Sequence, residues 1–150
     1  MVDLTTYEEV KLEDVAEFAR AKQGYTYPAG TSTIQISATR GQIGYLSEPG
    51  GVATKNVAII PQAGINPKYF NIVLMRNMDE FRAKHQTGIN IQENEIGKMP
   101  IQIANPETQS AIVQLWEFME RELIRETREL AALKKLKRNS LSKMFPEQNH

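Results

Sequence analysis

The C-terminal quarter of the chain constrains its fold more than any other segment. From Glu107 to about Lys143 the sequence contains no glycine and no proline, and it is rich in leucine, glutamate, arginine and lysine. This composition predicts one uninterrupted helix. At 1.5 Å per residue the helix would be roughly 55 Å long, several times the usual length in a globular protein. We therefore expect it to pack against something outside its own domain.

A capping signal marks the start of this helix, and an apolar stripe runs along it. Asn105 can cap the first turn, Pro106 fits a position whose N–H is not needed, and Glu107 favours the positive end of the helix dipole. Apolar residues then recur mostly three or four positions apart, with Thr127 interrupting them: Ile112, Leu115, Trp116, Met119, Leu123, Ile124, Leu130, Leu133, Leu136 and Leu141. All of these except Ile124 and Leu141 are predicted to form a dimer or partner surface.

The charges of the predicted helix are unevenly distributed along it. Glutamate is frequent in the first half, whereas Lys134, Lys135, Lys137 and Arg138 cluster near the end, where cations favour the dipole. This polarity favours antiparallel pairing with a second copy as a coiled coil. The alternative is a charged helix that folds back on its own domain. The continuation of the apolar stripe to Leu141 argues against that alternative.

Length and composition favour one domain plus this helix. The chain has 150 residues, of which 41% are hydrophobic and 24% charged, as in ordinary globular proteins. We divide it into a domain at 1–105, a helix at 106–145 and a disordered tail at 146–150. The absence of cysteine excludes disulfides, thiolate metal ligands and cysteine nucleophiles. Neither a signal-peptide core nor an apolar run of membrane-spanning length is present, so we expect a cytoplasmic location and no membrane partner.

The first half of the domain mixes helical and strand-like patterns. Apolar residues have helical spacing in 12–19, which predicts a short helix. Residues 31–37 alternate as in a strand, and glycines flank a predicted turn at Gln42-Ile43. The apolar run 57–60 favours a buried strand.

The second half of the domain predicts two helices and two short strands. Asn66 and Pro67 open a helix that we expect to reach Arg76, and a second helix is expected from Asp79 to just before Gly88. Short strand-like pieces follow at 89–91 and 99–103. The predicted architecture is therefore a compact α+β domain followed by a long helix.

The sequence contains little that predicts catalysis or a cofactor. The two histidines, His85 and His150, have no partner at metal-ligand or catalytic-triad spacing, so no metal is expected. The glycines do not form a dinucleotide-binding or phosphate-binding motif, so no cofactor is expected. The stretch Asn66-Pro67-Lys68-Tyr69 is similar to the Asn-Pro-Pro-Tyr/Phe loop of amino-methyltransferases, but it lacks the second proline and a Gly-rich strand upstream. A capped helix start explains it better.

Basic residues gather in the middle of the chain. Residues 1–19 contain one basic and six acidic residues, whereas residues 20–90 contain eight basic and three acidic residues. Between the basic residues lie polar and aromatic side chains of the kinds that contact phosphates and base edges. The predicted DNA-binding residues are Lys22, Gln23, Tyr25, Tyr27, Thr39, Arg40, Gln42, Lys55, Asn56, Lys84, His85 and Gln86. A mixed, solvated surface is the alternative explanation of this charge distribution.

Four stretches carry motifs of a known family. Residues 7–16 read YEEVKLEDVA, 36–44 read ISATRGQIG, 99–112 read MPIQIANPETQSAI, and 133–145 read LKKLKRNSLSKMF. In order and spacing they resemble the specificity (S) subunit of type I restriction-modification systems. The first is similar to its opening W-x-x-V-x-L-x-D-V/I-A, with Tyr7 where tryptophan is common. The others are similar to its G-x-I-G turn, its I-P-x-P-x-x-x-Q-x-x-I helix start, here with looser proline spacing, and its L-K-x-x-K…L-x-x-L-F helix end.

The resemblance implies a DNA-recognition subunit without catalytic activity. Residues 1–105 would form a target recognition domain that reads a few base pairs of double-stranded DNA. The helix would be a spacer that docks methyltransferase (M) subunits and, through them, the restriction (R) subunit. A full specificity subunit has two recognition domains and two antiparallel spacer helices, whereas this chain has one of each. It is therefore a half-length subunit that dimerises and reads an inverted repeat, or a remnant, an excised domain or a silent cassette.

Two other hypotheses remain at this point. A coiled-coil adaptor or regulatory remnant would bind protein and not DNA, and its retention on duplex DNA would lack the steep salt dependence of a DNA-binding subunit. A methyltransferase would need a site for S-adenosylmethionine, and nothing at cofactor-loop spacing supports one.

Overall fold

A computed structural model describes residues 1–144 of the chain. Residue 145 and the predicted tail at 146–150 lie outside the described residues. The chain divides into two compact units, Met1–Val113 and the segment from Gln114 onward. Each unit is described separately below.

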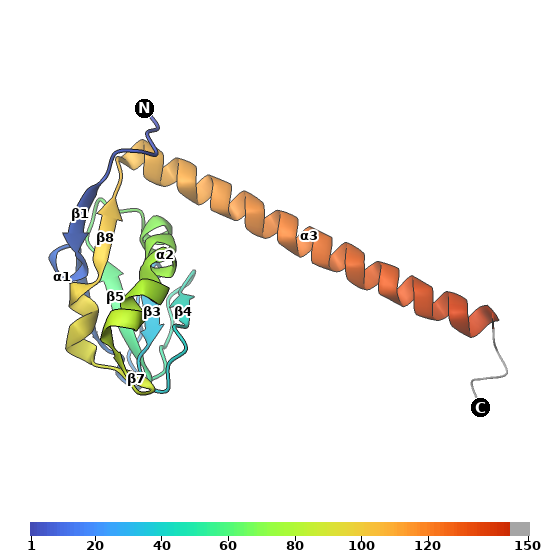
Figure 1. Cartoon of the computed structure of the whole chain (residues 1–150), viewed down its shortest axis with the longest axis horizontal. Helices are drawn as coiled ribbons and strands as arrows, with labels where there is room; N and C mark the ends of the chain where they lie inside the picture. The colour runs from blue at the N-terminus through green and yellow to red at the C-terminus, as the bar shows by residue number, and fades with distance from the viewer. Residues whose placement is uncertain (145–150) are drawn as a thin grey trace. The chain divides into compact units, whose positions relative to one another are not determined.

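A four-stranded antiparallel sheet forms the framework of the first unit (Figure 1). Its strands are β2 (Ala16–Arg20), β3 (Ser32–Gln35), β4 (Ile43–Tyr45) and β5 (Asn56–Pro61), in the order β2-β5-β3-β4. β5 pairs antiparallel with both β2 and β3. The last residues of β2 and β3 therefore lie at the edge of the sheet where β5 begins.

Shorter elements complete the first unit. β1 (Glu8–Lys11) pairs antiparallel with β8 (Pro100–Ile103), which brings the start of the domain beside its end. The single-turn α1 (Leu12–Val15) lies between β1 and β2, and the 3-10 helix η1 (Glu93–Lys98) precedes β8. A small hairpin of β6 (Gln86–Thr87) and β7 (Asn90–Ile91) follows the main helix of the domain.

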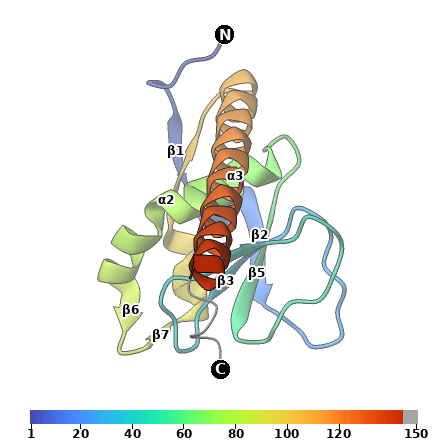
Figure 2. The same cartoon turned by 90° about the vertical axis from the view of Figure 1, so that its right-hand side faces the viewer.

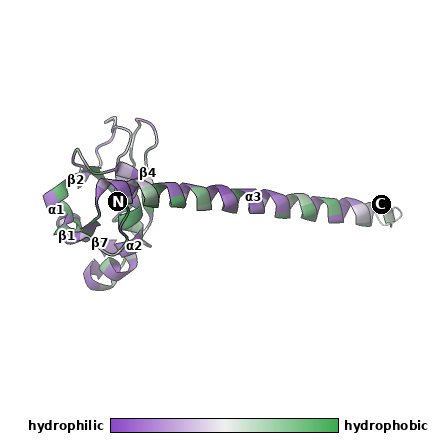
Figure 3. Cartoon of the chain, turned by 90° about the horizontal axis from the view of Figure 1, so that it is seen from above, coloured by the Kyte–Doolittle hydropathy of each residue, from purple (hydrophilic) through white to green (hydrophobic). Residues whose placement is uncertain are grey.

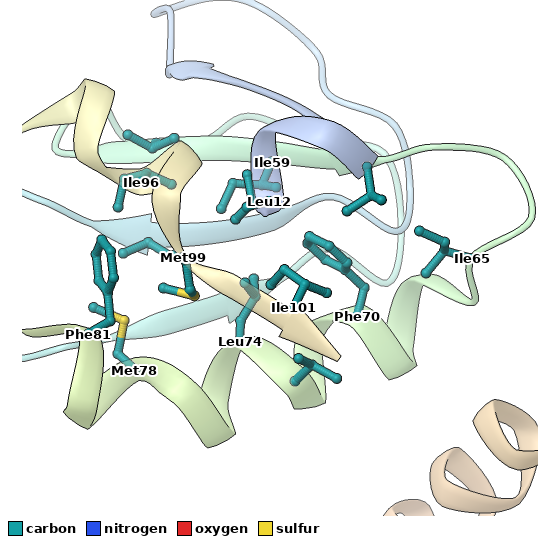
Figure 4. Packing of buried hydrophobic residues seen from close by; sticks show 14 of the residues in the cluster. Leu12, Ile59, Ile65, Phe70, Leu74, Met78, Phe81, Ile96, Met99 and Ile101 are labelled. Atoms are coloured by element: carbon teal, nitrogen blue, oxygen red, sulfur yellow. The ribbon is translucent and has the colours of Figure 1, made fainter. Parts of the chain in front are cut away.

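That main helix, α2 (Pro67–His85), packs its apolar side on the sheet (Figure 4). The side chain of Asn66 caps it by accepting hydrogen bonds from the backbone N–H groups of Lys68 and Tyr69. Several core side chains are fully buried, and each contributes about 1.5–3 kcal/mol relative to exposure: Leu12, Ile34, Val57, Ile59, Phe70, Leu74, Ile96, Met99 and Ile101. The core therefore joins α1, η1, β8 and α2 to the sheet.

Three predicted details of the domain were wrong. The predicted helix over 12–19 ends at Val15, because Ala16–Arg20 pair along their whole length with β5. The two helices predicted over 66–87 form one continuous α2, because nothing between Arg76 and Asp79 breaks the helix and Met78 is buried. Finally, the residues of the predicted Gln42-Ile43 turn lead into β4, and the chain turns one step earlier, at Gly41, where φ is +85°.

The predicted strands and the long helix are confirmed. β5 contains the apolar run 57–60, and β3, β7 and β8 lie within the strand-like stretches. α3 (Pro106–Met144) begins where the capping signal places it, with Oδ1 of Asn105 accepting the N–H of Thr108 at 2.8 Å. The α+β domain followed by one long helix is therefore the observed architecture.

The first turns of α3 belong to the compact domain. Val113 is buried in the core, and Ile112 packs against it. The Gln109 side chain accepts the N–H of Asn66 at 2.9 Å and donates to the carbonyl of Ala104 at 2.8 Å. The Thr108 hydroxyl accepts the N–H of Asp3 at 2.8 Å. These contacts extend the domain to Val113, past the predicted boundary at residue 105.

From Gln114 onward, hydrophobic residues recur among hydrophilic ones along α3 (Figure 3), and many of their side chains are exposed. Those at least 48% exposed are Leu115, Phe118, Met119, Leu123, Ile124, Leu130, Leu133, Leu136, Leu141 and Met144. Within 1–144, no helix combines the length and apolar character needed to cross a membrane.

Candidate nucleic-acid interface

Four chain segments meet at the edge of the sheet where β2 and β3 end and β5 begins, which we call the loop edge (Figure 2). They are the residues after β2, the loop 36–42 after β3, residues 53–55 before β5 together with Asn56 at its start, and the β6–β7 hairpin. The hairpin is tied to the loop after β3, since the N–H of Thr39 donates to the carbonyl of Ile89 at 2.7 Å and that of Ile91 to Ile36 at 3.0 Å. Sheet topology thus gathers residues that lie far apart in the sequence.

Arg20, the last residue of β2, links three of these segments. Its Nε donates to the carbonyl of Thr54 at 2.8 Å, and its Nη2 donates to Oγ of Ser37 at 3.0 Å. Its backbone N–H donates to Oε1 of Glu93 at 3.1 Å. The carbonyl of Lys55 accepts the N–H groups of Ile36 and Ser37 at 2.9 and 3.4 Å. The loops are therefore fixed to each other by hydrogen bonds.

The loop after β3 contains a tight turn, Ser37 to Gln42, which we call the 37–42 turn. Nε2 of Gln35 donates to the carbonyls of Ser37 and Ala38 at 3.0 and 3.1 Å. Nε2 of Gln86 donates to the carbonyl of Thr39 at 3.2 Å, and Nη1 of Arg82 donates to that of Arg40 at 2.6 Å. Four consecutive carbonyls are thus held by side chains of β3, α2 and β6.

Gly41 lets this turn lie directly on α2. Its φ of +85° is in the region that favours glycine. A Cβ built at this position would lie 2.8 Å from Cδ of Arg82. A side chain there would therefore push away the arginine that holds the Arg40 carbonyl.

The structure brings seven of the predicted DNA-binding residues to the loop edge: Lys22, Thr39, Arg40, Gln42, Lys55, Asn56 and Gln86. Lys22, Arg40, Gln42 and Lys55 are exposed. Thr39 is only 4% exposed, and Gln86 is committed to the 37–42 turn. Thr39 and Gln86 therefore contribute to the shape of the surface, and few of their polar atoms are available to a ligand.

Gln23, Tyr25 and Tyr27 lie in the long loop that runs from β2 to β3. Tyr27 is buried, and its hydroxyl accepts the N–H of Lys22 at 3.0 Å. Tyr25 is exposed and packs edge-on against Tyr27, with ring centroids 4.6 Å apart. Both rings line an open hollow of about 370 Å³ whose other residues include Ala58 and Ile60. The tyrosines therefore lie against one face of the sheet.

Lys84 and His85 make contacts with acidic residues. Lys84 pairs with Glu80 at 3.3 Å. Nδ1 of His85 lies 2.7 Å from Oε2 of Glu95, and its ring stacks on Phe81. Hydrogen bonds from Lys98 and His85 hold the pKa of Glu95 below its usual range. His85 is thus engaged within the domain. Among residues 1–144, no group of three or more His, Asp or Glu side chains could hold a metal ion.

Three residues of the loop edge were missed from the sequence: Arg20, Arg82 and Asn90. Arg20 ends a strand that was predicted as helix, so its position at the sheet edge was not visible. Arg82 lies on a helix, where an arginine usually indicates only a solvated face. Asn90 accepts the N–H of Ala38 at 2.9 Å, a contact across 52 positions that no local pattern predicts.

Comparison with known proteins gives matches at the level of structure. No family model matches the chain, and no curated protein matches it in sequence. The crystal structure of a type I restriction-modification system S subunit from M. genitalium matches with a TM-score of 0.65 and 16% identity, over 95% of this chain and 46% of that one. The HsdS subunit from Thermoanaerobacter tengcongensis matches with a TM-score of 0.68 and 14% identity, over 96% and 46%. The chain has the fold of a type I specificity subunit.

A third match agrees with the specificity-subunit fold. It comes from work on complex assembly and conformational transition of the type I restriction-modification system, with a TM-score of 0.73, 14% identity and coverage of 91% and 44%. The resemblance predicted from the motifs is therefore confirmed for the fold. The chain spans less than half the length of each of these three structures.

Proposed function

We propose that this chain is, or belongs to, a DNA-specificity subunit of a type I restriction-modification system, to which it contributes one recognition domain and one spacer helix. The observation that carries the proposal is the combination of the specificity-subunit fold with the exposed basic and polar residues at the loop edge. In this proposal the loop edge binds duplex DNA, and the chain catalyses no reaction itself.

The chemistry of the loop edge supports binding to DNA. Exposed Lys22, Arg40 and Lys55 can neutralise phosphates, and Gln42 can reach base edges. Hydrogen bonds hold the segments that carry them, so little conformational freedom is lost on binding. Rigid loops are also needed to distinguish one base pair from another.

We further propose that α3 pairs with α3 of a second copy in antiparallel orientation. The exposed apolar side chains from Leu115 to Leu141 need a partner that removes them from water. In an antiparallel pair the glutamate-rich first half of one helix meets the basic second half of the other, which is electrostatically favourable. Such a two-fold pair would read an inverted repeat and dock methyltransferase (M) subunits, and the restriction (R) subunit indirectly.

The test is selection and sequencing of duplex DNA fragments bound by the purified chain, with and without a candidate M subunit. We expect enrichment of one bipartite sequence and a steep decrease of affinity with salt. Retention that is independent of salt and sequence would contradict the proposal. It would favour the second candidate, a coiled-coil adaptor that binds protein through α3, which the exposed apolar stripe alone also supports.

A further inference from the structure

Two amide side chains accept hydrogen bonds from the backbone of the 37–42 turn: that of Gln42, within the turn, and that of Asn90, in β7. The backbone N–H of Arg40 donates to Oε1 of Gln42 at 2.7 Å, and that of Ala38 donates to Oδ1 of Asn90 at 2.9 Å. A backbone N–H can only donate, so the contacting atom of each amide must be its oxygen. Oε1 of Gln42 also accepts the hydroxyl of Thr39 at 3.5 Å, so both of its lone pairs are used, whereas Oδ1 of Asn90 keeps one. Both side chains are exposed and offer their NH₂ groups as donors.

The other polar groups of the turn also leave more hydrogen-bond donors than acceptors for a ligand. The carbonyls of Ser37, Ala38, Thr39 and Arg40 already accept hydrogen bonds from the domain. The exposed Arg40 guanidinium can only donate. The surface of the turn thus offers donors from Gln42, Asn90 and Arg40 to a ligand that brings acceptors.

We infer that the 37–42 turn reads guanine in the major groove, an inference that rests on the proposed DNA-recognition function. Guanine presents two adjacent acceptors there, N7 and O6. Adenine pairs its N7 acceptor with an N6 donor, and its usual recognition by a glutamine needs an amide oxygen that is free to accept, whereas Oε1 of Gln42 already accepts two hydrogen bonds. Thymine presents one acceptor beside a methyl group, and cytosine presents a donor. Guanine is the base that accepts two donors.

Phosphate oxygens also accept hydrogen bonds and are the rival ligand of the same donors. A phosphate contact adds affinity for all sequences and depends on salt. A guanine contact adds affinity at one position only. A phosphate contact and a guanine contact can therefore be distinguished by changing single atoms of a base in the DNA.

The first arm of the experiment changes the DNA. After the selected site of the full chain is known, each guanine of the half-site is replaced in turn by 7-deazaguanine, which lacks the N7 acceptor, or by inosine, which keeps N7 and O6. At one position we expect 7-deazaguanine to weaken binding on the order of 10-fold and inosine to bind nearly as well as guanine. This arm leaves the protein unchanged, so misfolding cannot explain its result.

The second arm changes the protein. Gln42→Glu keeps an oxygen to accept the Arg40 N–H and replaces the NH₂ donor by a second oxygen. We expect the preference for guanine at the same position to decrease on the order of 10-fold, with the other positions of the half-site unchanged. Gln62→Glu, which adds the same charge beyond the end of β5 at the opposite sheet edge, is the matched control and should retain the preference.

The outcomes separate this inference from the proposed function. A half-site without guanine, or one whose guanines all tolerate 7-deazaguanine, overturns the inference and leaves DNA recognition intact. A uniform loss of affinity for all sequences in Gln42→Glu, beyond that of Gln62→Glu, identifies a phosphate contact and also overturns it. Failure of the wild-type chain to bind duplex DNA in a salt-dependent manner overturns the proposed function and the inference together.

Discussion

The hydroxyl of Tyr69 joins α2 to the chain segment that leads from β8 into α3. It donates to the carbonyl of Gln102 at 2.5 Å and accepts the N–H of Ala104 at 3.3 Å. The side chain is 4% exposed, and burial raises the pKa of Tyr69 above its ordinary value. One side chain therefore satisfies two backbone groups at the junction between the domain and the long helix.

Removal of this hydroxyl should destabilise the domain. We expect Tyr69→Phe to lower the free energy of unfolding by about 1–3 kcal/mol at pH 7, because the buried N–H of Ala104 loses its acceptor. Urea unfolding measures the effect. Tyr25→Phe, at an exposed tyrosine, is the control and should change little. Equal stability of the two variants would contradict this role for Tyr69.

The raised pKa of Tyr69 also predicts a pH dependence at alkaline pH. The folded state holds the phenolic proton more tightly than the unfolded state, so this contribution is complete below pH of about 10 and is lost as pH rises through the folded pKa. As pH rises above about 10, the stability of the wild type should decrease more steeply than that of Tyr69→Phe. Parallel curves in urea unfolding over this range would exclude the linkage.

Substitution of Lys55 tests whether the loop edge contacts DNA phosphates. Its backbone carbonyl holds the loop after β3, while its exposed side chain is available to DNA. We expect Lys55→Ala to weaken binding to all duplexes alike and to reduce the slope of log affinity against log salt by about 0.9, which corresponds to one phosphate contact. Affinity measured at several salt concentrations gives both values. Lys68→Ala, at the N-terminal end of α2, should retain the wild-type slope.

At the scale of elements, α3 combines two different environments. Its first turns are held by Gln109, Thr108 and Val113 within the domain. From Gln114 onward its apolar side chains are largely exposed. Helices this long are stabilised mainly by packing of an apolar face, which supports a partner for this part of α3.

The stripe itself can be tested with charged substitutions. Met119→Glu combined with Leu130→Glu should convert a dimer to monomers with the domain still folded, because two carboxylates would enter an apolar seam. Sedimentation at tens of micromolar measures the state. Gln114→Glu with Ala132→Glu adds the same charge on the opposite side of the helix and should leave the dimer intact. A monomeric wild-type chain would refute the pairing.

At the scale of the whole molecule, the proposed dimer links half-site spacing to the length of α3. Two recognition domains held apart by helices should read two identical, inverted half-sites with a fixed gap. Insertion of seven residues after Thr127 keeps the stripe in phase and lengthens each helix by about 10 Å. We expect selected sites to keep the half-site and to change the gap by about three base pairs. Selection of a contiguous, non-palindromic site would contradict the symmetric arrangement.

Local sequence patterns were sufficient to predict the elements whose formation depends mainly on residues close in sequence. Residues 105–107 cap a helix whatever surrounds it, and the next 37 positions contain nothing that ends it. The apolar run of β5 and the Asn66 cap of α2 are equally local. Of the four stretches that resemble the specificity family, 99–112 spans β8 and the start of α3, and 133–144 lies at the end of α3. The local signals of α3 therefore carry part of the resemblance.

The loop edge could not be predicted in this way, because its geometry depends on contacts between distant segments. Residues 16–20 have helical spacing, yet they form β2 because pairing with β5 satisfies their backbone groups. Strand order then brings Arg20, Ser37 and Thr54 together. The engaged oxygens of Gln42 and Asn90 follow from the same arrangement. Residue type indicates that a glutamine can donate or accept, and only its neighbours in space decide which group remains for DNA.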